Sequence, residues 1–121
     1  VSGIATFIQE AAIVALDQDT TWMRDNYKER RDTSLRMLEE YSIKVVKPEG
    51  AFYFFVDVKE FNLSSEAFCE KALYEYKLAM VPGVYFGEHC DHFVRLSYAT
   101  GVDELYEGLR RLGKMVTDLR Q

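Results

Sequence analysis

Two neighbouring groups of side chains in the stretch FGEHCDHFVRLSYA are of types that do chemistry. The first group is four consecutive residues, His89, Cys90, Asp91 and His92, each of a type that binds metal ions. Zinc ligands usually come in pairs whose members are roughly two to four residues apart, and adjacent side chains of an extended segment point to opposite faces. At most two of these side chains can therefore converge, and we expect a polar connecting loop and no metal site.

The second group is a single arginine, Arg95, inside an apolar run. Its neighbours are residues that favour burial, namely Phe93, Val94, Leu96 and Tyr98. The guanidinium must therefore face water, a carboxylate partner or a ligand. Its planar fork can bind a carboxylate through two parallel hydrogen bonds, which a lysine ammonium cannot do. Arg95 is a candidate for binding an anionic substrate, and a solvated or ion-paired structural arginine is the alternative.

Two glycine-containing stretches lie upstream, PEGAFYFF and MVPGVYFG. The first predicts a turn and a buried strand, in which alternation sends Phe52 and Phe54 to one face and Tyr53 and Phe55 to the other. One of these aromatic pairs can border a pocket. The glycines of the second stretch permit close approach of the backbone to a ligand. Neither stretch matches a phosphate-binding fingerprint.

Composition limits the classes of function. The chain has 121 residues and a mass of 14.1 kDa, which suits one compact domain. Its net charge is -5 and its basic residues are scattered, so we expect no nucleic-acid partner. It lacks an uninterrupted apolar run of about 18 residues, so we expect no membrane span.

Cys69 and Cys90 are the only cysteines, which favours reduced thiols and a cytoplasmic location. Cys69 is typical of a core residue and Ser97 has no histidine at a motif-defined distance, so a hydrolase is not indicated.

Hydrophobic periodicity predicts an α+β fold, in which a helical arm is followed by a small, mostly antiparallel sheet of three to four strands packed with helices. We expect a kink at DQDTT between the first two helices. The expected elements are a helix from Ile4 to Leu16, a helix over about 20–41, a hairpin or near-hairpin of strands at 43–46 and 51–58, a helix over 65–76, a short strand opening AMVPGVYFG, a strand over 92–99 and a final helix after Thr100.

The order of these motifs resembles the C-terminal region of class I/II aminotransferases, the fold-type I enzymes that depend on pyridoxal 5'-phosphate. The resemblance rests on KPEGAFYFFVDV, VPGVYFG and FVRLSYA. ATFIQEAAIVAL is similar to the helix that the family places after its cofactor lysine, and ELYEGLRRLGKMV resembles its closing helix. The resemblance implies a trailing helix of the large cofactor domain at 1–18, a connecting helix at 19–41 and a small α+β domain at 42–121. The start of the chain, without methionine, likewise indicates a fragment.

The resemblance also implies roles for individual residues. Arg95 would bind the substrate α-carboxylate, Gly50 would lie beside the substrate, and Phe52 would lie near the same site. The lysine, aspartate and stacking aromatic residue that hold the cofactor belong to segments upstream of this chain, so no catalytic, cofactor-binding or metal-binding residue is assigned here. Several lysines occur outside the required context: Lys44, Lys47, Lys59, Lys71, Lys77 and Lys114.

These expectations describe the C-terminal part of a pyridoxal-phosphate-dependent aminotransferase, inactive alone, which in its complete form is a cytoplasmic homodimer acting on amino acids and 2-oxo acids. One alternative is a free-standing α+β binding module without catalysis, which predicts that the apolar face of the first helix is buried within the chain. The aminotransferase interpretation predicts that Ile4, Phe7 and Ile8 are exposed or covered by another copy. A lyase or decarboxylase using the same cofactor is a further alternative.

Overall fold

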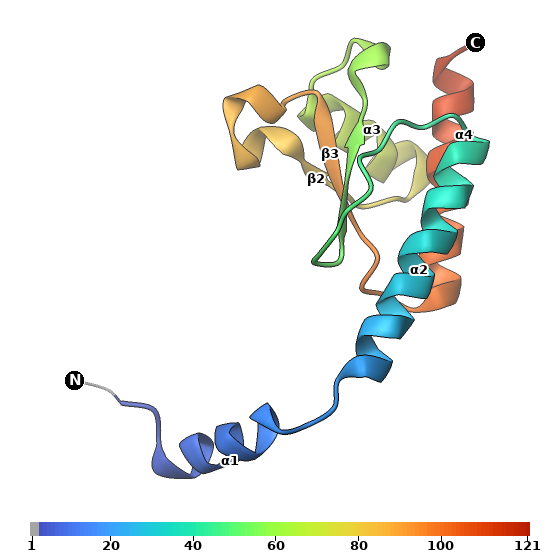
Figure 1. Cartoon of the computed structure of the whole chain (residues 1–121). Helices are drawn as coiled ribbons and strands as arrows, with labels where there is room; N and C mark the ends of the chain where they lie inside the picture. The colour runs from blue at the N-terminus through green and yellow to red at the C-terminus, as the bar shows by residue number, and fades with distance from the viewer. Residues whose placement is uncertain (1–2) are drawn as a thin grey trace.

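The computed structural model describes residues 3–121 and shows an α+β fold, as the sequence predicts. Four α-helices and three strands alternate with short 3-10 helices (Figure 1). In chain order the elements are α1 (Thr6–Leu16), α2 (Thr21–Glu40), β1 (Tyr53–Asp57), η1 (Lys59–Phe61), α3 (Ser65–Tyr76), β2 (Val81–Pro82), η2 (Gly83–Phe86), η3 (Glu88–Cys90), β3 (Phe93–Ser97) and α4 (Val102–Leu119).

The three strands form one antiparallel sheet in the order β1-β3-β2. Burial alternates along β1 and β3, as expected for a sheet with only one face covered. The covered face packs against the helices and carries Phe54, Val56, Val94 and Leu96. Arg95 lies on the opposite face, at the middle of the central strand.

The predicted hairpin or near-hairpin of 43–46 and 51–58 is present only in part. Segment 43–46 makes only an isolated bridge, between Val45 and Val56, and β1 instead pairs over its whole length with β3. Strand propensity shows that a segment can pair, but it does not identify the partner. β3 offers five consecutive partners and buries the same apolar face as β1, whereas Pro48, ahead of the turn, has no N–H for a ladder.

Helix α3 begins and ends where the sequence predicts. Ser64 is its N-cap, and the Ser64 side chain accepts a hydrogen bond of 3.1 Å from the backbone N–H of Ala67. At the other end Lys77 adopts a left-handed conformation with φ 56°, which terminates the helix. The helix packs Phe68 and Ala72, both fully buried, onto the sheet.

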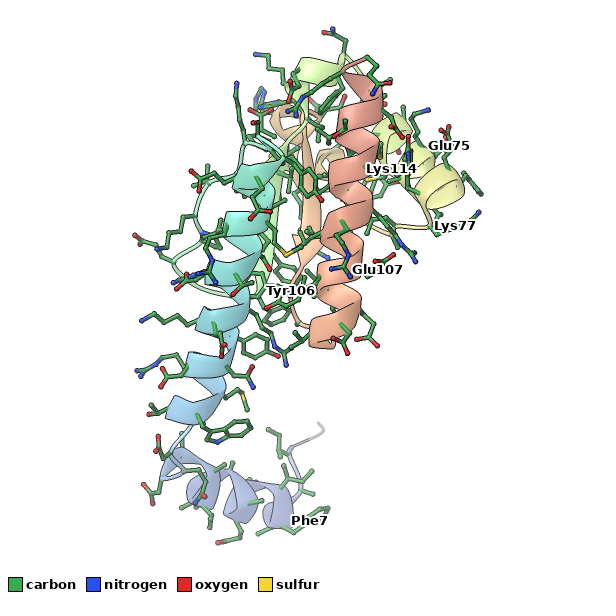
Figure 2. All side chains as sticks on the ribbon, turned by 90° about the vertical axis from the view of Figure 1, so that its right-hand side faces the viewer. Phe7, Glu75, Lys77, Tyr106, Glu107 and Lys114 are labelled. Atoms are coloured by element: carbon green, nitrogen blue, oxygen red, sulfur yellow. The ribbon has the colours of Figure 1, made fainter. Side chains whose placement is uncertain are left out.

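Helices α2 and α4 lie side by side and cover the sheet (Figure 1). One face of α4 is apolar and buried, with Leu105, Leu109 and Leu112 in the core. Gly113 is required for this packing, because a Cβ atom there would overlap the ring of Tyr41 at the end of α2. The polar face of α4 carries Glu107 and Lys114, which point outward in Figure 2.

Helix α1 stands away from this body (Figure 1). None of its residues is buried, and Phe7, at the far end of the arm in Figure 2, is 75% exposed. Ile4 and Ile8 are exposed as well. The apolar face of α1 therefore has no partner among the residues that the structure describes. Over the same residues no helix is both long and apolar enough to span a membrane.

Candidate functional site

Arg95 is the one cation on the open face of strands β1 and β3. Its register partner on β1 is Phe55, and its partner on β2 is Val81. The guanidinium carbon lies 4.3 Å from the ring centroid of Tyr53 and 4.7 Å from that of Phe86. Within residues 3–121 the structure records neither an ion pair nor a hydrogen bond from the Arg95 side chain. The interpretation of Arg95 as an ion-paired structural residue is therefore not supported, and its N–H groups are available to an anion.

Aromatic rings surround this guanidinium. Phe55 packs edge-on against Phe86, with ring centroids 5.5 Å apart, and against Phe93, at 5.9 Å. Such apolar surroundings strengthen the attraction between Arg95 and an anion, because the local dielectric constant is lower than that of water. The acid on the same strand face, Asp57, accepts a hydrogen bond of 2.9 Å from the backbone N–H of Lys59 at one end of the strand.

The loop that carries Phe86 is held by a hydrogen-bond network. Ser65 is fully buried, and both its N–H and its hydroxyl donate to Oδ1 of Asp91, at 2.9 and 2.8 Å. The same hydroxyl oxygen accepts a 3.2 Å bond from the N–H of Val84. Gly83 allows the backbone to pack closely here, because a Cβ atom at this position would overlap the carbonyl oxygens of Cys90 and Phe93. Helix α3, η2 and the segment that leads into β3 are thereby held together.

Of the four residues 89–92, Asp91 has a structural role in this network. The hydrogen bonds from Ser65, above all that of its hydroxyl, lower the pKa of Asp91 below its ordinary value. His92 packs its ring against that of Phe93, with centroids 4.2 Å apart. Among residues 3–121 no three side chains of His, Cys, Asp or Glu are grouped as metal ligands.

Gly50 lies in an exposed turn that faces helix α2 across a cavity. A Cβ atom at Gly50 would meet no other atom within 4 Å, so neither steric crowding nor a positive φ requires glycine here. The turn borders a cavity of about 480 Å³, whose basic lining residues are Arg24, Lys28 and Arg31 on α2. The structure does not bring Gly50 into recorded contact with Arg95.

Phe52, the residue before β1, is 39% exposed. Its ring stacks against Tyr27 of α2, with centroids 6.1 Å apart, and contacts the ring of Tyr53 at 4.5 Å. Tyr53 in turn contacts the Arg95 guanidinium, so Phe52 is connected to the arginine through one intervening ring.

The largest of the recorded cavities lies elsewhere. It has a volume of about 580 Å³ and lies between α3 and residues 79–85, and Arg95 does not line it. Cys69 borders it from the buried side, and burial raises the pKa of the Cys69 thiol to about 11. At neutral pH this thiol is protonated, so Cys69 is not an activated nucleophile.

Sequence reasoning identified Arg95, and it gave Tyr53 and Phe55 as one of two aromatic pairs that could border a pocket and the loop 82–87 as a wall of the site, but it did not identify Tyr53 and Phe86 as the rings that contact the arginine. Tyr53 could have been found from alternation alone, since it shares a strand face with Phe55, and a register that places Phe55 opposite Arg95 brings Tyr53 close. Phe86 carries no such signal, because η2 follows an irregular path that is set by Gly83 and by the network of Ser65.

Comparison with known proteins gives consistent matches over nearly the whole chain. The family described as Aminotransferase class I and II matches residues 2–112. Aspartate aminotransferase of Pyrococcus abyssi is 41% identical over 93% of this chain, and aromatic-amino-acid aminotransferase 2 of Thermococcus litoralis is 40% identical over the same share. The crystal structure of aspartate aminotransferase from Thermotoga maritima superposes with a TM-score of 0.87 at 40% identity, covering 96% of this chain. In each case the chain spans about 30% of the relative's length.

Proposed function

The chain belongs to the class I and II aminotransferase family, and on this premise we propose that it supplies the arginine that binds the substrate α-carboxylate. The reaction served would be amino transfer between an amino acid and a 2-oxo acid. The observation that carries the proposal is the state of Arg95: its guanidinium lies on an open sheet face between aromatic rings, with no recorded acidic partner in residues 3–121. Gly50 and Phe52 remain proposed neighbours of the substrate.

The exposed arm supports the proposal that this chain works as part of a larger protein. A free-standing binding module would bury the apolar face of α1, whereas Phe7 and its neighbours are exposed here. We propose that residues 1–18 belong to the large cofactor domain, that 19–41 connect the two domains, and that 42–121 form the small domain. In the complete enzyme, proposed to be a cytoplasmic homodimer, α1 would be covered.

The residues of this chain do not fit a site for pyridoxal 5'-phosphate. When bound, the cofactor supplies the electron sink for chemistry at the substrate α-carbon, and it needs a lysine for attachment. No lysine is among the residues of β1 and β3 that share the face of Arg95. Lys71 and Lys114 are held in ion pairs on the helices that cover the other face. The cofactor would therefore be bound by residues outside this chain, and we propose that the chain alone is inactive.

The role proposed for this chain is to bind and orient the substrate. Two parallel hydrogen bonds from the Arg95 guanidinium would fix the plane of the carboxylate, and with it the direction of the α-carbon. The aromatic walls exclude water from one side of this contact, which strengthens it.

The test is the substitution Arg95→Gln in the full-length enzyme. We expect KM to rise about a hundredfold for amino acid and 2-oxo acid alike, since a bidentate charge-assisted pair is lost, while the absorption of the bound cofactor is retained. Arg110→Gln is the matched control, because Arg110 is an exposed arginine on α4 that pairs only with Glu107. Unchanged kinetic constants in Arg95→Gln would overturn the proposal. Analysis of the reaction products separates a transaminase from a lyase or decarboxylase.

A further inference from the structure

We infer that Tyr53 and Phe86 are positioning residues that hold the Arg95 guanidinium in the orientation needed to receive a carboxylate. The inference rests on the proposed function of Arg95 and adds to it two residues that contact the arginine without being expected to contact the substrate themselves. Tyr53 comes from β1 and Phe86 from η2, so two segments distant in sequence converge on one side chain.

The geometry of the contacts favours this role. An arginine that contacts a ring within about 6 Å of its centroid is attracted by the π-electrons of the ring. Arg95 meets two rings well inside this limit, at 4.3 and 4.7 Å. Rings take up the face of a guanidinium and leave its N–H groups, which point outward in its plane, for hydrogen bonding. Aromatic contact and carboxylate binding are therefore compatible on the same side chain.

The two rings are the recorded contacts that can fix the orientation of the Arg95 guanidinium. In residues 3–121 no carboxylate or carbonyl oxygen is recorded as fixing the long Arg95 side chain, which would otherwise sample several rotamers. An arginine fixed before the substrate arrives loses less conformational entropy on binding than a mobile one. Tyr53 is held by the sheet and Phe86 by the hydrogen-bonded loop, so both rings can restrict the rotamers of Arg95.

Phe86 is itself well supported although it is 44% exposed. Its ring packs edge-on against Phe55, directly opposite Arg95 in the sheet register. Its short helix is anchored by the bond from the N–H of Val84 to the buried hydroxyl of Ser65. The loop therefore presents Phe86 to the arginine in a defined place.

The experiment compares two classes of amino donor in the full-length holoenzyme: an amino acid, and the corresponding amine that lacks the carboxyl group. For Tyr53→Leu and for Phe86→Leu we expect KM for the amino acid to rise about three- to thirtyfold with kcat largely retained. Turnover of the amine should not change, because it does not use Arg95. Tyr53→Phe keeps the ring and should behave as the wild type.

Controls separate positioning from general damage. Tyr85→Leu is the matched control, because Tyr85 precedes Phe86 in η2 but is 67% exposed and bonds to Glu66 instead. In an Arg95→Gln background the substitution Tyr53→Leu should have little further effect, since the ring acts through the arginine. If Tyr53→Leu does not fold, Phe86→Leu at the exposed loop provides the same measurement.

The outcomes distinguish the two proposals. If Arg95→Gln affects amino acid and amine equally, the role of Arg95 itself is refuted. If Arg95→Gln selectively weakens the amino acid while Tyr53→Leu and Phe86→Leu do not, only the positioning role is refuted. An equal loss with amino acid and amine in the ring variants would likewise refute positioning and indicate a general structural role.

Discussion

Replacing Ser65 by alanine tests the network that holds the loop beside Arg95. The substitution removes the 2.8 Å bond from the Ser65 hydroxyl to Asp91 and leaves the N–H of Val84 without its 3.2 Å acceptor. An amide deprived of its partner in a partly buried position costs about 1–3 kcal/mol, so we expect the free energy of unfolding to fall by about that amount at neutral pH. Urea denaturation followed by circular dichroism measures the loss.

The pH dependence of this loss gives the sharper test. Asp91 has a lowered pKa in the folded state, so the stabilisation from its bond to Ser65 is full above its ordinary value of 3.8 and is lost as pH falls through the lower folded-state pKa. The difference between wild type and Ser65→Ala should therefore shrink in acid. Ser64→Ala is the matched control, because it removes only the helix cap and should cost about 1 kcal/mol at every pH. A loss for Ser65→Ala that is independent of pH would refute the reasoning.

Two further predictions concern the glycines and the cysteines. Gly83→Ala should lower the free energy of unfolding by about 1–3 kcal/mol in urea denaturation, because the added Cβ atom would overlap backbone oxygens that cannot easily move. Gly50→Ala should change it by less than about 1 kcal/mol, since the space around Gly50 is open. Equal effects would contradict the assignment of Gly83 as the sterically required glycine. Cys69 should react with a disulfide reagent at pH 8 much more slowly than the half-buried Cys90 in the native protein, because burial raises the pKa of the Cys69 thiol to about 11 and leaves little thiolate. Equal rates of modification at both thiols would contradict this.

The helices could be predicted from the sequence because their signals are local. The N-cap at Ser64 and the apolar periodicity of α4 lie within a few residues of the structure that they specify. The partner of β1 could not be predicted in this way. Its full-length neighbour is β3, some distance along the chain, whereas segment 43–46 makes only an isolated bridge on the other side of β1, and local strand propensity does not distinguish the two pairings.

In the candidate site, too, local signals could be predicted from the sequence and contacts that depend on the tertiary fold could not. An arginine inside an apolar strand is visible in the sequence, so Arg95 could be singled out before the structure was known. The contact with Phe86 depends on the path of η2, which is fixed by the steric requirement at Gly83 and by the hydrogen bond that the N–H of Val84 donates to the hydroxyl of Ser65 on α3. Phe52 was predicted near the substrate site, and the structure places its ring against Tyr27.

The short strand β2 has a consequence for association between molecules. A sheet edge with free backbone groups is a template on which a strand of another molecule can pair, which is how many proteins aggregate. Here one edge strand consists of Val81 and Pro82, and the proline has no N–H to donate to an added strand. On the other edge, segment 44–45 already occupies part of β1 through the bond from Asp57 to the carbonyl of Lys44 and the bridge at Val45. The sheet thus resists growth by strand addition.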